Sequence, residues 1–252
     1  MSAQFKNRRE LILHLNKTKA ELAVEVGVRD GYFSKFILDN TSIKKLYAID
    51  PWERNAELGA TIDEILEKNL TNNVFFIRFL NILSDSDMEY VLSIQTKPSL
   101  ITSFIYNYIY KNINNTKVDI FLKKYDWLAK EIYETCKSIL EPFGERCEMI
   151  KAYSPSASEM FEDASLDFVY IDGAHDYNSV KSDLNAWYKK LKIGGILSGH
   201  DYDLNDWPGV YHSVNEFIVM NKLELNLTGL DEFDINLNCK DGGKPSFYFT
   251  KK

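Results

Sequence analysis

Cysteine is scarce in this sequence, and none of the spacings that mark disulfide frameworks or zinc sites is present. The 252 residues include three cysteines, which are odd in number, widely separated and outside any CxxC or cysteine–histidine pattern: Cys136, Cys147 and Cys239. We therefore predict reduced thiols. The first residues, MSAQFKNRRELILHL, scatter charges among apolar residues and lack the apolar core and small-residue cleavage site of a signal peptide. Together these absences predict a cytoplasmic protein.

An excess of positive charge is also missing. The chain has 30 lysines and arginines against 37 aspartates and glutamates, which gives a net charge of −7 and an isoelectric point near 5.2. Because binding to phosphates requires a basic face, we expect no nucleic-acid partner. The longest apolar stretches, residues 74–83 and 100–110, are too short and too polar to cross a bilayer. We therefore expect no membrane partner.

What the chain does contain is typical of a globular protein, with 45% hydrophobic and 13% aromatic residues. Its length fits one α/β domain with an insertion, or two small domains.

Near the amino terminus, Leu11, Ile12 and Leu15 predict one face of a short helix over residues 8–15 that packs on a sheet edge.

Residues 166–203 have the pattern of one strand–helix–strand unit. A buried strand at 166–171 leads through an acidic turn into an amphipathic helix at 177–191, and a second strand at 196–198 ends in another acidic turn. The apolar stripe of the helix includes Trp187, which we assign to the core. Because parallel strands end at the same edge of a sheet, the two acidic turns are expected to be neighbours where α/β sheets bind ligands.

The amino-terminal part has the pattern of half a nucleotide-binding unit. A strand at 20–26 leads through the turn from Gly27 to Gly31 into a helix, and a strand at 46–49 ends at Asp50. A dinucleotide site requires a G-x-G-x-x-G turn, but here Arg29 occupies the point where the backbone must approach a pyrophosphate. This disfavours a nicotinamide-dependent oxidoreductase. The two glycines could also simply make a tight strand-to-helix turn.

The arrangement E-x-G-x-x-x-G from Glu25 to Gly31 resembles the cofactor loop of class I S-adenosylmethionine-dependent methyltransferases. Further motifs follow in order: Asp50-Pro51-Trp52, LDFVYIDGAHDY from Leu166, a helix ending in LKIGG, GHDY from Gly199, and PGV from Pro208. Together they resemble the Methyltransferase-24 family over roughly residues 20–55 and 125–250. The resemblance implies a Rossmann-like α/β fold with a seven-stranded, mostly parallel sheet, helices on both faces, and S-adenosylmethionine as cofactor.

The resemblance also implies where the cofactor lies. A strand-end carboxylate, here Glu25, is expected near the methionine end of the ligand, Asp50 at both ribose hydroxyls, and Ser154 against the adenine. Ser154 could instead be only a turn residue, and residues 156–159 have the pattern of a capping box for a short helix. The expected cofactor-binding residues are Glu25, Gly27, Gly31, Asp50, Trp52, Ser154 and Asp172.

The acidic turns suggest how an acceptor is activated. Methyl transfer from a sulfonium is an in-line displacement, so the protein must align the acceptor and remove its proton, with a histidine base or with a divalent cation. Asp172, His200 and Asp201 are candidate ligands for magnesium, manganese or a similar ion. The candidate catalytic residues are His175, His200 and Asp172. Each of these residues could instead only cap its turn, and Asp176 is expected to cap the following helix.

Residues 59–124 depart from the family pattern, and Phe104 and Tyr108 fall there at helical spacing. We predict a helical insertion after the second strand, within a single methyltransferase domain that spans residues 1–252. The insertion could form a lid or a wall for the acceptor, a contact that makes the protein a homodimer, or an extra packed layer.

The sequence therefore predicts an S-adenosylmethionine-dependent methyltransferase that O-methylates a hydroxyl of a sugar or small metabolite, with help from a divalent cation as one option. The partner we expect is a small-molecule or saccharide acceptor. One alternative is a cofactor-binding module that has lost catalysis and serves in assembly. The other is an NAD-dependent oxidoreductase.

Overall fold

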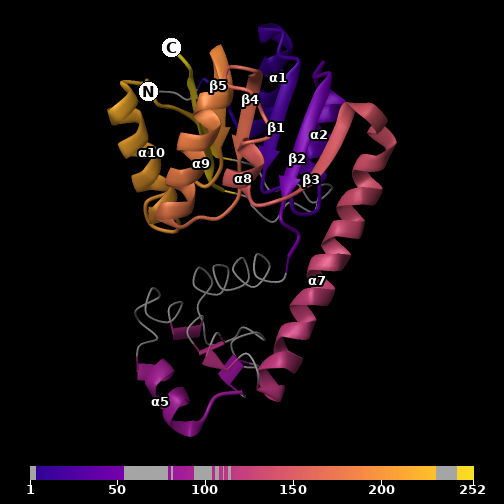
Figure 1. The fold of residues 1–252 in the computed structure, drawn as a ribbon. Helices are drawn as coiled ribbons and strands as arrows, with labels where there is room; N and C mark the ends of the chain where they lie inside the picture. Colours follow the sequence, from indigo (N-terminus) through magenta and orange to yellow (C-terminus); the bar gives the residue numbers. More distant parts are fainter. Residues whose placement is uncertain are drawn as a thin grey trace. The chain divides into compact units, whose positions relative to one another are not determined.

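The computed structural model describes residues 4–53, 79–80, 82–93, 104–105, 108–109, 111–112, 115–230 and 243–252 (Figure 1). The chain divides into two compact units. Met1–Pro51 and Ile132–Lys252 make the first unit, and Trp52–Glu131 makes the second. Cys239 and much of the predicted 59–124 insertion lie outside the described residues.

The first unit contains a seven-stranded sheet in the order β3-β2-β1-β4-β5-β7-β6 (Figure 1). The five strands from β3 to β5 in this order are parallel, and β7 pairs antiparallel with both β5 and β6. This confirms the predicted seven-stranded, mostly parallel sheet. The strands are β1 (Leu22–Val26), β2 (Lys45–Asp50), β3 (Cys147–Lys151), β4 (Leu166–Ile171), β5 (Leu191–Gly199), β6 (Asn226–Leu230) and β7 (Pro245–Thr250).

Helices cover both faces of the sheet, as predicted. Val24 and Val26 of β1 belong to a core cluster with apolar residues of α8 (Ser154–Ser158), α9 (Tyr177–Lys190) and α10 (Pro208–Asn221). Because side chains alternate along a strand, Glu25 between them faces the other side. On that side Glu25 contacts α2 (Tyr32–Asn40) through a hydrogen bond to Ser34. The remaining amino-terminal helix is α1 (Arg8–Thr18), which precedes β1 along the chain.

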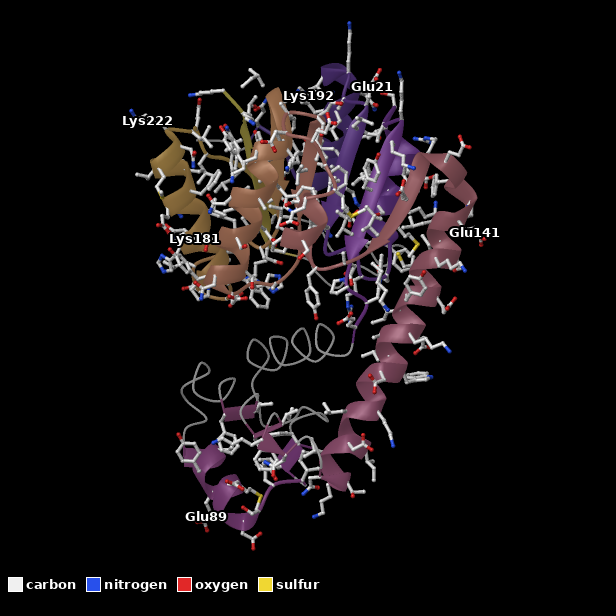
Figure 2. The ribbon with its side chains drawn as sticks, in the orientation of Figure 1. Glu21, Glu89, Glu141, Lys181, Lys192 and Lys222 are labelled. Carbon is white, nitrogen blue, oxygen red and sulfur yellow. The ribbon has the colours of Figure 1, made fainter. Side chains whose placement is uncertain are left out.

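Helix α9 forms where the sequence predicted an amphipathic helix. Val180, Leu184 and Trp187 are buried along one stripe, which confirms the assignment of Trp187 to the core. Lys181 lies outside this stripe, and its ammonium group pairs with Glu216 of α10 at 3.0 Å (Figure 2). Asp176 caps the helix as predicted, because its side chain accepts hydrogen bonds from the backbone N–H groups of Asn178 and Ser179, both at 3.1 Å.

The parallel register aligns the ends of four strands. Val26 of β1 pairs with Ile49 of β2 and with Ile171 of β4, and Ile171 pairs with Gly199 of β5. The polar and glycine residues that complete or follow these ends therefore share one edge of the sheet. They are Gly27, Asp50, Asp172 and His200.

Helix α7 (Thr116–Leu140) begins where Asn115 accepts the N–H of Lys117 and so caps the helix. Two predictions at the ends of elements differ from the structure. Strand β5 begins at 191 rather than at 196, because a register shift absorbs the glycine turn within the strand. The capping box predicted at 156–159 is wrong: α8 already begins at Ser154, with Pro155 in its first turn.

The second unit has its own apolar cluster. The described buried residues are Phe79, Val91, Ile105, Ile109, Val118 and Leu122, contributed in part by α5 (Asp85–Ser93) and α7. Phe104 and Tyr108, predicted at helical spacing, are both helical, and their rings stack at 5.9 Å. What this unit does stays a prediction.

Within the described residues, none of the helices combines the length and the apolar character needed to span a membrane.

Candidate functional site

The turns after β1 and β4 are packed backbone against backbone. The N–H of Gly27 donates to the carbonyl of Ile49 at 2.9 Å, and the N–H of Asp172 donates to the carbonyl of Val26 at 2.8 Å. Gly27 has a φ of +84°, and a Cβ added there would lie 2.0 Å from the carbonyl oxygen of Asp172. Only glycine fits this position, so Gly27 is required by packing whether or not a ligand is bound.

Glu25 lies beneath this turn and is only 1% exposed. The hydroxyl of Ser34 on α2 donates to its carboxyl oxygen at 2.5 Å. Burial raises the pKa of Glu25 to about 8, and the nearby Asp172 adds to this, whereas the Ser34 hydrogen bond and the charge of Arg8 oppose it. At neutral pH this side chain is therefore mostly a neutral acid that can donate a hydrogen bond as well as accept one.

Replacement of Glu25 should change how stability depends on pH. The folded-state pKa of about 8 exceeds the ordinary value of 4.5, so the stability that this group contributes is fully present below pH 4.5 and is lost as the pH rises through 8. Glu25→Gln keeps a neutral side chain at every pH. We expect similar unfolding free energies for both proteins near pH 5 and a variant more stable by roughly 1–3 kcal/mol near pH 9. Urea unfolding without cofactor, repeated across this pH range, measures the unfolding free energy of both proteins. If the difference between the two proteins stays the same at every pH, the prediction is wrong.

Asp50 completes β2 and is buried at the same edge. One of its carboxylate oxygens accepts the backbone N–H of Arg29 at 2.9 Å. Arg29 adopts a φ of +50°, and its bond to Asp50 ties the loop between Gly27 and Gly31 to the end of β2. A carboxylate has about four acceptor positions, so this bond is compatible with the predicted hydrogen bonds to ribose.

The other residues expected at the cofactor have contacts of their own. Gly31 has a φ of +86°, and a Cβ there would lie 2.9 Å from the sulfur of Cys136. Trp52 is buried with a φ of +40° and is the first residue of the second unit. The Ser154 hydroxyl donates to Asp183 at 2.6 Å and accepts from the indole of Trp187 at 2.8 Å. These bonds join α8 to α9, and a role of Ser154 at an adenine stays a prediction.

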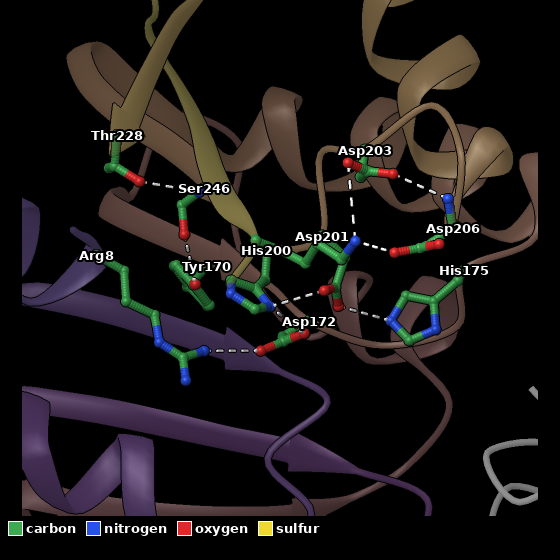
Figure 3. Close-up of polar contacts among 11 residues, drawn as sticks. Arg8, Tyr170, Asp172, His175, His200, Asp201, Asp203, Asp206, Thr228 and Ser246 are labelled. Atoms are coloured by element: carbon green, nitrogen blue, oxygen red, sulfur yellow. Dashed lines mark hydrogen bonds and ion pairs between the residues drawn. The ribbon is translucent and has the colours of Figure 1, made fainter. Parts of the chain in front are cut away.

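The two acidic turns meet at Asp201. One carboxylate oxygen of Asp201 lies 3.1 Å from Nδ1 of His200, and the other lies 3.0 Å from Nε2 of His175 (Figure 3). Burial alone would raise the pKa of the Asp201 carboxyl, but the two neighbouring histidines outweigh it and hold that pKa well below its ordinary value. Asp201 is therefore an anion between two imidazoles.

Loop packing fixes both imidazoles. The His175 ring lies against Trp207, with ring centroids 4.0 Å apart, and a Cβ on Gly209 at the start of α10 would lie 2.2 Å from the His175 carbonyl oxygen. The backbone N–H of His200 donates to the carbonyl of Ile171 at 3.1 Å. The His175 side chain remains 24% exposed, whereas that of His200 is fully enclosed. Of the two histidines, His175 is thus the one that solvent or a substrate can reach.

Three residues of this cluster could hold a metal ion. One ligand atom from each of Asp172, His175 and Asp201 lies within 4.8 Å of the other two. Two carboxylate oxygens and one imidazole nitrogen suit manganese or a similar divalent cation. The sequence predicted Asp172, His200 and Asp201 instead, and Nδ1 of His200 lies 3.9 Å from Asp172. Which imidazole binds an ion stays a prediction.

Arg8 is the residue near this cluster that the sequence analysis missed. It lies in the first turn of α1, and its guanidinium lies 3.4 Å from Asp172. A signal was present, because positions 8, 11, 12 and 15 share one helix face, and an arginine on an otherwise apolar face needs a buried partner.

The Methyltransf_24 family model, which describes a methyltransferase domain, matches residues 24–202. The uncharacterized protein y4gI of Sinorhizobium fredii is 26% identical over 78 residues, which are 31% of this chain and 9% of y4gI. The match thus spans under a tenth of that curated relative.

Three solved structures illustrate the structural likeness. SMU.1697c of Streptococcus mutans, a proposed methyltransferase in complex with SAH, gives a TM-score of 0.51 at 10% identity, covering 99% of this chain and 100% of that chain. A proposed rRNA methylase of Clostridium thermocellum gives 0.51 at 12% identity, with 99% and 100% covered. Precorrin-6y C5,15-methyltransferase of Geobacter metallireducens gives 0.50 at 9% identity, with 100% and 94% covered. At these identities the likeness shows a shared fold.

Proposed function

The chain belongs to the Methyltransf_24 family of methyltransferase domains, and we propose that this S-adenosylmethionine-dependent methyltransferase acts on a hydroxyl of a sugar or another small metabolite. The observation that supports a hydroxyl acceptor is the convergence of Asp172, His175 and Asp201 at the carboxyl edge of the sheet. A hydroxyl is a poor nucleophile until it loses its proton. A site for such acceptors therefore needs a base that removes this proton, or a cation that lowers the pKa of the hydroxyl.

The cofactor half of the site consists of Glu25, Gly27 and Asp50. When bound, S-adenosylmethionine supplies a methyl group on a positively charged sulfur. Asp50 can accept hydrogen bonds from ribose hydroxyls with the acceptor positions that the Arg29 N–H does not use. Because Gly27 packs directly on the backbone of Asp172, the donor and acceptor halves of the site are held at a fixed separation. An in-line displacement requires such a fixed arrangement of donor and acceptor.

The acceptor half consists of Asp172, His175 and Asp201. We assign proton removal to His175, because it is partly exposed and its Nε2 is oriented by Asp201 at 3.0 Å. His200 is enclosed, so we assign it the supporting role of holding Asp201 from the other side. The same cluster offers the oxygen and nitrogen donors that a divalent cation binds, and a bound cation would lower the pKa of the acceptor hydroxyl.

Metal removal tests whether a cation takes part. We expect protein dialysed against EDTA to lose at least roughly tenfold in methyl transfer and to regain it with Mn²⁺ more than with Mg²⁺, because an imidazole ligand favours the softer ion. The measurement uses methyl-labelled S-adenosylmethionine and a panel of sugars and small hydroxyl compounds. A metal-free protein with full activity would leave His175 as the base without an ion. A label that never reaches a hydroxyl would overturn the proposed acceptor class.

A further inference from the structure

Arg8 is a buried cation on a helix that the family model does not cover. It is 5% exposed, and the match to the family begins only at residue 24. Its helix, α1, presents Arg8 on the same face as Leu11, Ile12 and Leu15, which are all buried. Taking a guanidinium out of water is costly unless a charge or hydrogen bonds compensate it. An apolar side chain at this buried position would avoid that cost. The groups that compensate the charge of Arg8 are therefore informative.

Asp172 and Phe33 are among the groups that contact the Arg8 guanidinium. Its Nη1 lies 3.4 Å from Oδ2 of Asp172, and its central carbon lies 4.7 Å from the centre of the Phe33 ring. Phe33 in turn lies against Tyr170 of β4, with ring centroids 4.6 Å apart. The guanidinium is thus held in place by stacking and directed at the carboxylate that follows β4.

The contacts continue across the site, where acidic side chains alternate with basic ones. Asp172 turns Oδ2 toward Arg8 and Oδ1 toward Nδ1 of His200, at 3.9 Å. His200 then meets one oxygen of Asp201, and His175 meets the other (Figure 3). Because a carboxylate is planar, holding one oxygen of Asp172 on Arg8 also determines where its second oxygen points.

We propose that Arg8 is a positioning residue of the methyl-transfer site, which orients the Asp172 carboxylate toward His200 and Asp201. This inference rests on the proposed function, since the site it serves is the acceptor half. It also makes the amino-terminal helix part of that site. Any buried arginine needs a compensating partner, and the carboxylate that Arg8 contacts belongs to the cluster.

Arg8→Met and Arg8→Lys test this, with Arg9→Met as the matched control. Arg9 is the next residue of α1 and lies over the Phe36 ring at 5.3 Å. The main readout is the carbon–proton resonance of each histidine ring at one fixed pH, assigned with His200→Gln. We expect Arg8→Met to move the His200 resonance and Arg8→Lys to move it less, because lysine keeps the charge. Arg9→Met should leave it in place.

Asp172→Asn shows whether Arg8 acts through Asp172. In that background, Arg8→Met should add little further change to the His200 resonance. An equal change in both backgrounds, or an unmoved His200 resonance in a folded Arg8→Met protein, overturns the inference. If Arg8→Met does not fold, Arg8→Lys decides in the same way, since it must still shift the resonance relative to the wild type.

Kinetics separate this inference from the proposed function. With a hydroxyl acceptor in hand, Arg8→Met should lower kcat by about 10- to 100-fold, as expected for a residue that orients an active group, with KM changed less than about threefold. A wild-type protein that methylates no hydroxyl, together with a shifted His200 resonance, would overturn the acceptor class and leave the positioning role standing. Full kcat in Arg8→Met would overturn the positioning role alone.

Discussion

Asp201→Asn is expected to lower methyl transfer by about 10²- to 10⁴-fold, the range that acid–base assistance contributes, while the affinity for S-adenosylmethionine changes less than about threefold. Asparagine keeps the size of the side chain and also tolerates the φ of +58° that Asp201 adopts. The substitution therefore removes the charge with little effect on the backbone. Asp172→Asn should lower methyl transfer by a similar factor.

The large effect follows from the position of Asp201 between the two imidazoles. Its two carboxylate oxygens contact His175 and His200, at 3.0 and 3.1 Å. Without its negative charge, His175 loses the group that orients Nε2, and a cation loses a ligand. The prediction therefore holds for either way of activating the acceptor.

Asp203→Asn is the matched control. Asp203 lies on the same loop, but one of its carboxylate oxygens accepts the backbone N–H groups of Asn205 and Asp206, at 2.8 and 2.9 Å, and so shapes the turn. We expect this variant to keep its rate within about threefold. Label transfer from S-adenosylmethionine measures the rates, and calorimetry measures cofactor affinity. An Asp201→Asn protein that transfers methyl groups at the control's rate would contradict the site.

The sequence was sufficient to predict that the acidic turns would meet, because that follows from parallel pairing alone. Once β4 and β5 are adjacent and parallel, Ile171 pairs with Gly199. The residues that follow them, Asp172 and His200, must then be neighbours. The cap at Asp176 was predictable from local pattern, whereas the seven-stranded sheet was expected because the motifs resemble those of a known family.

The contacts inside the cluster were not predictable in this way. Asp201 lies between the histidines because of its left-handed backbone and because Trp207 and Gly209 hold the His175 turn. Those interactions come from loop packing, which has no periodicity to read. Arg8 belongs to a helix that precedes the sheet, so only its position on an apolar face hinted at a buried partner.

Gly27→Ala is expected to be the most damaging single-methyl change in the described part of the site. The added Cβ would lie 2.0 Å from the carbonyl oxygen of Asp172 and 2.7 Å from the nitrogen of Gly173. These are backbone atoms of a paired strand end, so they cannot rotate away as a side chain could. Overpacking and the left-handed backbone together should cost about 3–5 kcal/mol of unfolding free energy.

The structure offers a control that separates the two costs. Gly194 has a φ of +82°, almost that of Gly27, yet a Cβ there would have no atom within 4 Å. Gly194→Ala should therefore lose only about 1–2 kcal/mol, the cost of a left-handed alanine. Denaturant unfolding measures both variants, and equal losses would show that the overlap with Asp172 is relieved cheaply. Since Gly27 joins the cofactor turn to the acceptor turn, we further expect Gly27→Ala to weaken S-adenosylmethionine binding by at least roughly tenfold, whereas Gly194→Ala should bind it normally.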